Sequence, residues 1–324
     1  MRYMLPMVPI LTLLLIATSI NSANSSLQQE VSIQNMGDIL YQDNFAEKIF
    51  FESGAESGVL QPPWDWVGLM GNGDMTGSYA RVDTEQSHSG TKSIKIYQVP
   101  PPKSDAQRRV YVSHQSHTEL EFYWSYWAFY PTGYDTVVET ANFLNTGGLT
   151  LYWRNPSIGW STNKGLRLRF HPGVDANGFY ERVSWSGIDD ENPDTPAWSE
   201  TFDPWGIDGG RPWFWDAAKI YIDLNEWHHY QVYIKVSNGT NIDGQITVWI
   251  DDNLSLNKTG IPTNPAYWGY PASGESFNDG KTGPYYTCGI EQYGDYNTPQ
   301  LSVWYDDMVA ATEKVPESYV VGFP

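Results

Sequence analysis

The stretch 227–312 constrains the fold most, because it reads as four consecutive β-strands whose side chains alternate between two faces. In the first two runs the apolar residues occupy alternate positions, and a turn signal at Asp243 and Gly244 separates these runs. The four runs are 229–236, 245–251, 285–293 and 301–309. A strand of this kind buries one face against a second sheet and leaves the other to solvent or ligand. The pattern predicts an all-β fold, a two-sheet antiparallel β-sandwich.

Earlier parts of the chain continue the same pattern, with long Trp-rich loops between the strands. Strands are expected at 49–52, 90–97, 119–130, 147–153 and 165–171. The segment 172–226 has weak periodicity and is predicted to be a long loop region, and its five tryptophans argue against disorder. A short hairpin or helix inside it stays open. With 324 residues and 40% hydrophobic content, we expect one sandwich domain over 39–314 and a tail over 315–324.

The N-terminus has the layout of a secretory signal. Residues 1–23 contain one arginine, an apolar run and small residues near the end, and 24–38 is a polar lead-in. A retained membrane anchor is the alternative, but the apolar run is short for a span and contains Pro6 and Pro9. We therefore expect a protein that is secreted or held at the cell surface, with no transmembrane segment in the mature chain.

The amino-acid composition limits the classes of molecule that the protein can bind. A net charge of −19 makes nucleic acid a poor partner, whereas 15 Trp and 22 Tyr exceed what a core of this size needs. Aromatic rings stack on the C–H faces of sugars while carboxylates and amides bind their hydroxyls, so we expect a polysaccharide or glycan partner. The single cysteine, Cys288, excludes an intrachain disulfide and is expected to be a buried, inert thiol in a monomeric protein.

Several motifs together resemble the secreted concanavalin A-like jelly-roll proteins, especially polysaccharide lyases of the alginate, heparin and glucuronan type. The resemblance covers most of 49–312. It is carried by Phe51–Gly54, His88–Ser93, Ser125–Trp127, Trp227–Tyr230, Asp243–Asp252, Gly289–Glu291 and Val303–Asp307. It implies a jelly-roll fold and a glycan-binding groove, whereas a fold alone does not fix a function.

The resemblance also implies a site. In such lyases the strand of Gly289 reads Lys-x-Gly-x-Tyr, with the three named side chains in the groove and the tyrosine as acid or base. Here Thr287 stands at the lysine position and Glu291 at the tyrosine position, with Tyr293 next on the same face. Thr287 and Gly289 are therefore substrate-contacting candidates, and the departure at Glu291 weakens the assignment of lyase activity.

A basic stripe on the run 165–171 offers substitutes for the missing lysine and tyrosine. Arg167, Arg169 and His171 share one face of this run, which is unusual in so acidic a chain. β-Elimination needs the uronate carboxylate neutralised and a proton removed by a base. As a lyase, the chain would use Arg167 and Arg169 against the carboxylate, Tyr293 or His171 as the base, and Glu291 to orient hydroxyls.

Three alternatives stay open. The first is a non-catalytic carbohydrate-binding or cell-surface adhesion module with Trp249, Tyr233 and loop tryptophans as platforms. The second is a glycoside hydrolase using Glu291. Hydrolases need a second carboxylate at a defined separation, and the sequence does not identify a second carboxylate on a strand that pairs with Glu291. The third is a structural envelope protein without a glycan ligand.

A structural Ca²⁺ is the remaining prediction, and it follows from related β-sandwich modules in which the ion clamps the first strand to the last. The matching positions are Glu52, the carbonyl region of Lys92, and Asp306 or Asp307. Hard oxygen ligands from distant parts of the sequence suit Ca²⁺, and such a clamp would stabilise a sandwich without disulfides.

Overall fold

The computed structural model describes the greater part of the chain. It covers residues 45, 47–60, 64, 66–71, 77–100, 108–116, 120–141, 144–153, 164–188, 217–261, 263, 285–294 and 298–321. The segment from Ile49 to the C-terminus forms one compact unit, separate from the preceding part of the chain. The predicted signal peptide (1–23) and lead-in (24–38) lie outside the described residues. Within the described ranges, no helix has the length and apolar character needed to cross a membrane.

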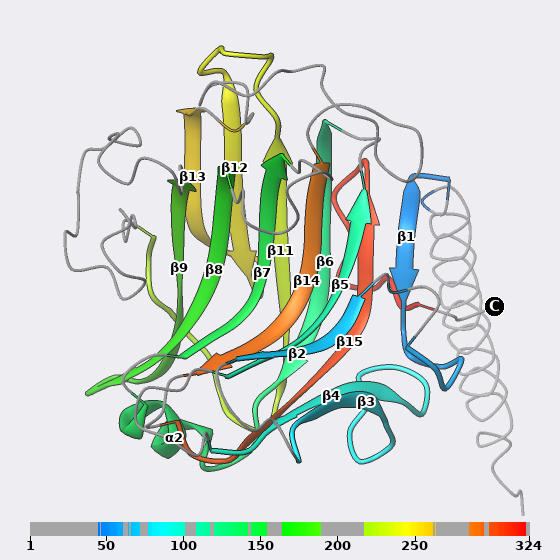
Figure 1. The fold of residues 1–324 in the computed structure, drawn as a ribbon, viewed down its shortest axis with the longest axis vertical. Helices are drawn as coiled ribbons and strands as arrows, with labels where there is room; N and C mark the ends of the chain where they lie inside the picture. Colours follow the sequence, from blue (N-terminus) through cyan, green and yellow to red (C-terminus); the bar gives the residue numbers. More distant parts are fainter. Residues whose placement is uncertain are drawn as a thin grey trace, which may run out of the picture. The chain divides into compact units, whose positions relative to one another are not determined.

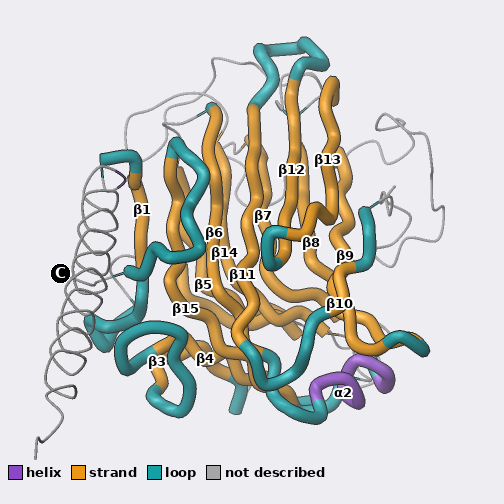
Figure 2. The backbone as a smooth tube through the Cα atoms, turned by 180° about the vertical axis from the view of Figure 1, so that it is seen from behind, coloured by secondary structure: helices purple, strands orange, loops and turns teal. Residues whose placement is uncertain are grey.

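Two antiparallel sheets, A and B, make up this unit (Figure 1). In the described residues, the strands of the eight-stranded sheet A are β1 (Ile49–Ser53), β3 (Tyr79–Asp83), β4 (Ser93–Gln98), β6 (Glu121–Phe129), β11 (Trp227–Lys235), β12 (Gly244–Ile250), β13 (Asn253–Ile261) and β15 (Leu301–Ala311). Their order is β13-β12-β11-β6-β15-β4-β3, and β1 also pairs with β15. Figure 2 shows the same strands from behind.

Sheet B lies in front in the view of Figure 1. Its seven strands in the described residues are β2 (Trp66–Gly71), β5 (Arg108–Ser116), β7 (Leu144–Trp153), β8 (Lys164–Asp175), β9 (Gly178–Ile188), β10 (Ile220–Tyr221) and β14 (Tyr285–Gly294). Their order is β10-β9-β8-β7-β14-β5-β2. The strands of the two sheets overlap all nine runs predicted from alternation, so the all-β, two-sheet jelly-roll prediction is confirmed.

The inner faces of the two sheets meet in one aromatic and aliphatic core. Tyr126 of β6 stacks on Tyr230 of β11 at 5.0 Å, and Phe170 of β8 meets both rings edge-on, at 6.1 and 5.3 Å. Such pairs contribute about 0.5–1.5 kcal/mol each beyond area burial. Cys288 of β14 is fully buried in the same core, and burial raises the pKa of its thiol well above the usual value. The predicted inert thiol is consistent with this position.

The segment 172–226, predicted to be a long loop region, is partly strand, and that prediction is wrong for its first part. Strand β8 runs on through Pro172 to Asp175 and forms a hairpin with β9. Proline is tolerated there because the pairing of β8 with β7 ends at Phe170, so Pro172 has a ladder partner only on the β9 side. Residues 189–216 lie outside the described residues.

A network of buried hydrogen bonds between the two sheets holds β14 in position. Gln292 of β14 accepts a hydrogen bond from Tyr134 of helix α2 (Tyr134–Thr140) at 3.0 Å and donates one to Tyr305 of β15 at 2.7 Å. Burial raises the pKa of both tyrosines well above the usual value, so both hydroxyls keep their protons. A fully satisfied buried network specifies one arrangement of its elements, and here it sets which residues of β14 face outward.

Candidate functional site

The basic stripe and the Gly289 strand meet on the outer face of sheet B. Arg169 of β8 pairs with Gly148 of β7, which in turn pairs with Gly289 of β14. On β8 the neighbouring Leu168 and Phe170 are buried in the core, so Arg169 points outward. Arg169 and Gly289 therefore lie on the same face and in the same row, where a row is a line of register partners that runs across the strands. They are two strands, or about 10 Å, apart.

A β-bulge decides what lies in the next row. Thr146 of β7 pairs with both Phe170 of β8 and Gln292 of β14, and the register on β14 shifts between Gly289 and Gln292. The residues that follow on these two strands, His171 and Tyr293, therefore share a row. Bulges re-aim side chains and are frequent beside active sites. The bulge places the register position of Tyr293, rather than that of Glu291, across from His171.

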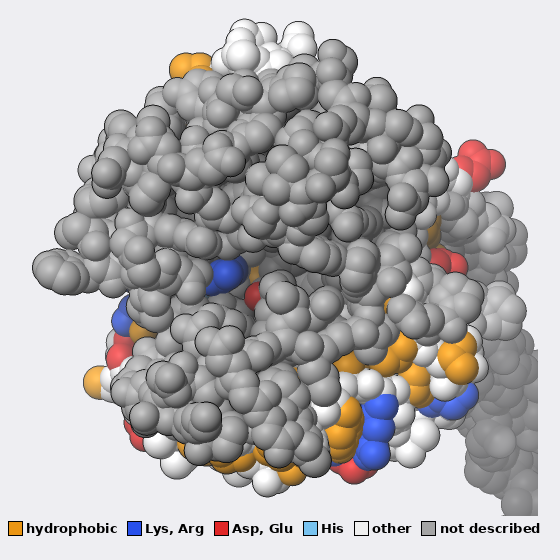
Figure 3. All heavy atoms as spheres, viewed as in Figure 1, with side chains coloured by type: hydrophobic (Ala, Val, Ile, Leu, Met, Phe, Trp, Pro, Cys, Tyr) orange, Lys and Arg blue, Asp and Glu red, His pale blue; other side chains and the backbone are white. Residues whose placement is uncertain are grey.

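Glu291 lies within this bulge, on the outer side of β14. The flanking Ile290 and Gln292 point into the core, and Glu291 is itself only 6% exposed. Figure 3 views the molecule from this side, and a basic and an acidic side chain are visible close together near the middle of the view. A carboxylate that is shielded from water interacts more strongly with a nearby charge than an exposed one does. Glu291 therefore shares the outer face of sheet B with Arg169 and His171.

Strand β9 adds two residues that the sequence did not indicate. Ser184 pairs with Arg169 and its Oγ lies 2.6 Å from His171 Nε2, while Arg182 pairs with His171 and donates from Nε to the Ala217 carbonyl at 3.2 Å. If the imidazole Nε2–H donates to Ser184, its Nδ1 carries the lone pair. Ser184 therefore fixes the orientation of the histidine ring, whichever of the two groups donates.

Three of the predicted site residues can be placed only by register. Arg167 pairs with Thr150 of β7, and Thr287 of β14 pairs with the same Thr150, so these two share the row on the other side of Arg169. The side chains of Arg167, Thr287 and Tyr293 lie outside the described residues.

The predicted aromatic platforms do not belong to this face. Tyr233 of β11 and Trp249 of β12 lie on the outer face of sheet A, because Ile234 and Val248 beside them are fully buried in the core. Tyr233 meets the ring of Tyr123 at 4.9 Å and donates to Glu121 at 2.6 Å. Tyr233 and Trp249 therefore belong to sheet A, whereas the other two predicted substrate-binding residues, Thr287 and Gly289, belong to sheet B.

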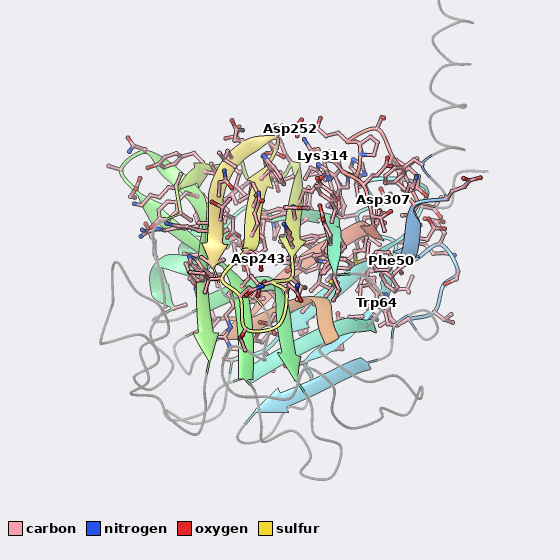
Figure 4. The ribbon with its side chains drawn as sticks, turned by 90° about the horizontal axis from the view of Figure 1, so that it is seen from above. Phe50, Trp64, Asp243, Asp252, Asp307 and Lys314 are labelled. Atoms are coloured by element: carbon pink, nitrogen blue, oxygen red, sulfur yellow. The ribbon has the colours of Figure 1, made fainter. Side chains whose placement is uncertain are left out.

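The C-terminal segment crosses the outer face of sheet A near Trp249. Lys314 lies 5.3 Å from the centre of the Trp249 ring and forms an ion pair with Asp252 at 3.0 Å. Figure 4 shows Lys314 and Asp252 close together, seen from above. Val315, one residue further on, is buried and accepts a hydrogen bond from Gln231 of β11 at 2.8 Å. This part of the sheet is therefore covered by the protein's own chain.

The predicted calcium ligands are engaged with protein donors. Asp306 Oδ2 accepts hydrogen bonds from the backbone N–H groups of His88 and Ser89, and Asp307 accepts from Ser89 Oγ at 2.8 Å and from the Val321 N–H at 2.8 Å. Glu52 is exposed and accepts from the Tyr319 hydroxyl at 2.8 Å. Burial and the neighbouring Asp307 carboxylate raise the pKa of Asp306 to about 8.

In this arrangement the oxygens do not fit a Ca²⁺ site, which needs six to eight oxygen ligands directed at one point. Among the described residues, no three His, Cys, Asp or Glu side chains converge in a way that could hold a metal. The backbone of Lys92 is also engaged, since its N–H donates to Glu56 at 2.8 Å. The calcium site therefore stays a prediction without geometric support from these side chains.

Thermal denaturation with and without Ca²⁺ tests whether the protein binds a structural calcium ion. Because protein donors occupy the oxygens of Asp306 and Asp307, we expect the same Tm in excess Ca²⁺ and in excess EDTA. An ion that bound only the folded state would instead raise Tm by mass action. A calcium-dependent rise that disappears in the Asp306→Asn variant would contradict the expectation and establish the metal clamp.

Comparison with known proteins yields similar structures only. No protein-family model matches the chain, and no curated protein matches it. A glucuronan lyase from the fungus Trichoderma reesei has 14% identity and a TM-score of 0.49, covering 82% of this chain and 96% of that one. An alginate lyase from Aplysia kurodai has 10% identity and a TM-score of 0.45, covering 82% and 99%. The cellulose-induced protein Cip1 has 17% identity and a TM-score of 0.43, covering 82% and 98%.

At these identities the likeness concerns the fold, and it does not say which reaction, if any, this chain catalyses. With TM-scores below 0.5, the assignment of the fold rests on the strand order, the registers and the shared core of the two sheets. The chain is a two-sheet antiparallel β-sandwich of jelly-roll type, with Arg169 and His171 on the outer face of sheet B.

Proposed function

We propose that the protein is an exported polysaccharide lyase that cleaves a uronate-containing glycan by β-elimination. One observation carries the proposal: the registers bring Arg169, His171 and Glu291 to one face of sheet B, with Tyr293 in the row of His171. Two arginines, a histidine and a tyrosine position on adjacent rows match what this reaction needs from a protein. The net charge of −19 makes so local a concentration of cations informative.

The reaction assigns each residue a task. Arg169, with Arg167 one row away, balances the charge of the uronate carboxylate and so favours loss of the adjacent C5 proton. His171, oriented by Ser184, accepts that proton. The electrons form the C4–C5 double bond as the bond from C4 to the glycosidic oxygen breaks, and Tyr293 donates a proton to the departing oxygen. No water is consumed, and Glu291 orients sugar hydroxyls.

The hydrolase alternative is less well supported by the same face. A glycosidase needs two carboxylates about 5–9.5 Å apart. Among the described residues of this face, the other carboxylate is Asp175 of β8, two strands away from the β14 residue Glu291. It lies about 13 Å along the strand beyond His171, so it is more than about 13 Å from Glu291. Asp175 is also held by Lys219 at 2.7 Å. The spacing favours elimination over hydrolysis.

The non-catalytic alternative rests on a different surface. Tyr123 and Tyr233 are partly exposed on the outer face of sheet A, where their rings lie 4.9 Å apart. Paired half-buried rings are a platform on which a sugar can stack. This surface supports binding without cleavage and is independent of the basic face of sheet B.

Product analysis tests the proposed function. The mature protein is incubated with uronate and neutral polysaccharides, and soluble products are analysed by mass spectrometry and ultraviolet absorbance. Elimination gives unsaturated oligosaccharides one water lighter than the hydrolysis products, and we expect these from a uronate substrate alone. Hydrated products would overturn the lyase in favour of a hydrolase, and no product from any polysaccharide would favour the binding module.

A further inference from the structure

A second cluster of aromatic and polar side chains lies on the same face of sheet B, at its β10 edge. Tyr180 of β9 and Tyr221 of β10 are register partners, and their rings meet edge to face at 5.8 Å. Tyr180 is two residues from Arg182, the register partner of His171. Because side chains two apart on a strand share a face, both tyrosines lie on the face that carries His171.

The tyrosine pair is held in a fixed place. Tyr180 lies over Gly173 of β8, where an added Cβ would come within 2.3 Å of the Tyr180 ring. Lys219 Nζ lies 4.2 Å from the centre of the same ring and donates to Asp175 at 2.7 Å. Glycine at position 173 therefore lets Tyr180 lie flat against the strand, while Lys219 covers its other side.

Tyr221 is the exposed member of the pair, with 44% of its surface open to solvent. Its hydroxyl donates to Asp175 at 3.1 Å and accepts from the side-chain amide of Asn177 at 3.2 Å. An exposed ring with a fixed hydroxyl, an amide, a carboxylate and an amine around it offers a stacking surface together with hydrogen-bonding groups of both kinds. That combination suits a sugar, which has an apolar face and a rim of hydroxyls.

The cluster lies within reach of a chain bound at His171. Tyr180 is one strand across and one row along from His171, about 8 Å away, and Tyr221 is two strands across, about 12 Å away, by the usual strand spacings. In the described part of sheet B, β9 is the only strand between β8, which carries His171, and β10, which carries Tyr221. A polysaccharide cleaved at His171 can therefore extend obliquely across β9 to the β10 edge.

We propose that Tyr221, supported by Tyr180 and Lys219, forms a distal binding position for a sugar residue of the same acidic glycan. This inference rests on the proposed function for its substrate class. Stacking on Tyr221 and hydrogen bonds to Asn177 and Lys219 provide the affinity, because Asp175 already balances the charge of Lys219. The carboxylate of the sugar bound here points to solvent, so the position selects for chain length rather than for charge.

The Tyr221→Ala variant of the whole protein tests the distal position, with fractionated oligosaccharides of glucuronan and alginate as probes. Removing one stacking ring is expected to raise KM for long oligosaccharides about fivefold to tenfold. The kcat on the shortest cleaved oligosaccharide is expected to stay at the wild-type value. Tyr97→Ala is the matched control, because Tyr97 also pairs with another tyrosine, Tyr79, but on sheet A.

Calorimetric binding of the same oligosaccharides separates this inference from the proposed function. If the wild type cleaves nothing but Tyr221→Ala still binds long oligosaccharides more weakly than Tyr97→Ala does, the distal position stands and the lyase assignment falls. If Tyr221→Ala matches the wild type for every length, the distal position is overturned. An equal loss for short and long oligosaccharides, or a lower Tm than that of Tyr97→Ala, would also overturn it by indicating a structural role.

Discussion

Replacing His171 by alanine is expected to lower the kcat for a uronate polysaccharide by about 10²- to 10⁴-fold, the usual contribution of a general base. His171 is on the row after Arg169, so a carboxylate held by Arg169 brings the adjacent C5 proton toward the imidazole. The rate of formation of the unsaturated product, followed by ultraviolet absorbance, measures the effect. Unchanged turnover in a variant with the wild-type Tm would assign the base to Tyr293 instead.

Ser184→Ala is the companion to this variant, because Ser184 acts on the reaction only through His171. We expect a smaller loss of kcat than in His171→Ala. The imidazole remains in the variant but loses the hydrogen bond that orients it, so kcat falls while KM stays near the wild-type value. A lower Tm with unchanged kcat would instead indicate a purely structural role for Ser184.

Alternation in the sequence was sufficient to predict most of the sandwich. The predicted inward residues Tyr230, Val232 and Ile234 are fully buried, and Arg169 and His171 of the predicted basic stripe are on the outer face of β8. Period two decides which residues share a face, and the burial of apolar side chains decides which face turns inward. These local rules were enough for β8, β11, β12, β14 and β15.

Strand β9 escaped prediction because its inward side carries a charged residue. Phe179, Val183 and Trp185 are buried, but Glu181 between them is also fully buried, which breaks the apolar series that would have marked the strand. Pro172 strengthened the impression that β8 ends there. Without β9, the sequence could not indicate Ser184, which is the hydrogen-bond partner of His171.

The bulge of β14 and the assignment of strands to sheets are set by tertiary pairing. The pairing of β14 with β7 shifts by one residue between Gly289 and Gln292, and the pairing of β7 with β8 shifts by one residue between Thr146 and Gly148. The alternation within β14 stays intact, so the sequence carries no sign that Tyr293 moves into the row of His171. Likewise, Tyr233 and Trp249 alternate correctly, but alternation does not say which of two sheets a strand joins. The sequence therefore predicted which residues of a strand share a face, but it did not predict the register between strands or the sheet to which each strand belongs.

Asp307→Ala is expected to lower the free energy of unfolding by about 3–5 kcal/mol, because three buried or partly buried donors lose one acceptor. These donors are Ser89 Oγ, the Val321 N–H and the ring of His88, whose Nδ1 lies 2.7 Å from Asp307 Oδ2. They join β15, the loop before β4 and the C-terminal segment at one carboxylate. Urea denaturation measures the change.

Asp307→Asn separates the acceptor role of this residue from its charge. Asparagine keeps an oxygen for Ser89 and Val321, and it tolerates the left-handed backbone at this position, where φ is 45°. Alanine loses both advantages, so the asparagine variant is expected to retain most of the stability. If the two variants were equally destabilised, the negative charge itself would be required at Asp307. The source of that requirement is then either the His88 ring, which contacts Oδ2, or a bound cation, and the comparison of Tm in Ca²⁺ and in EDTA distinguishes the two.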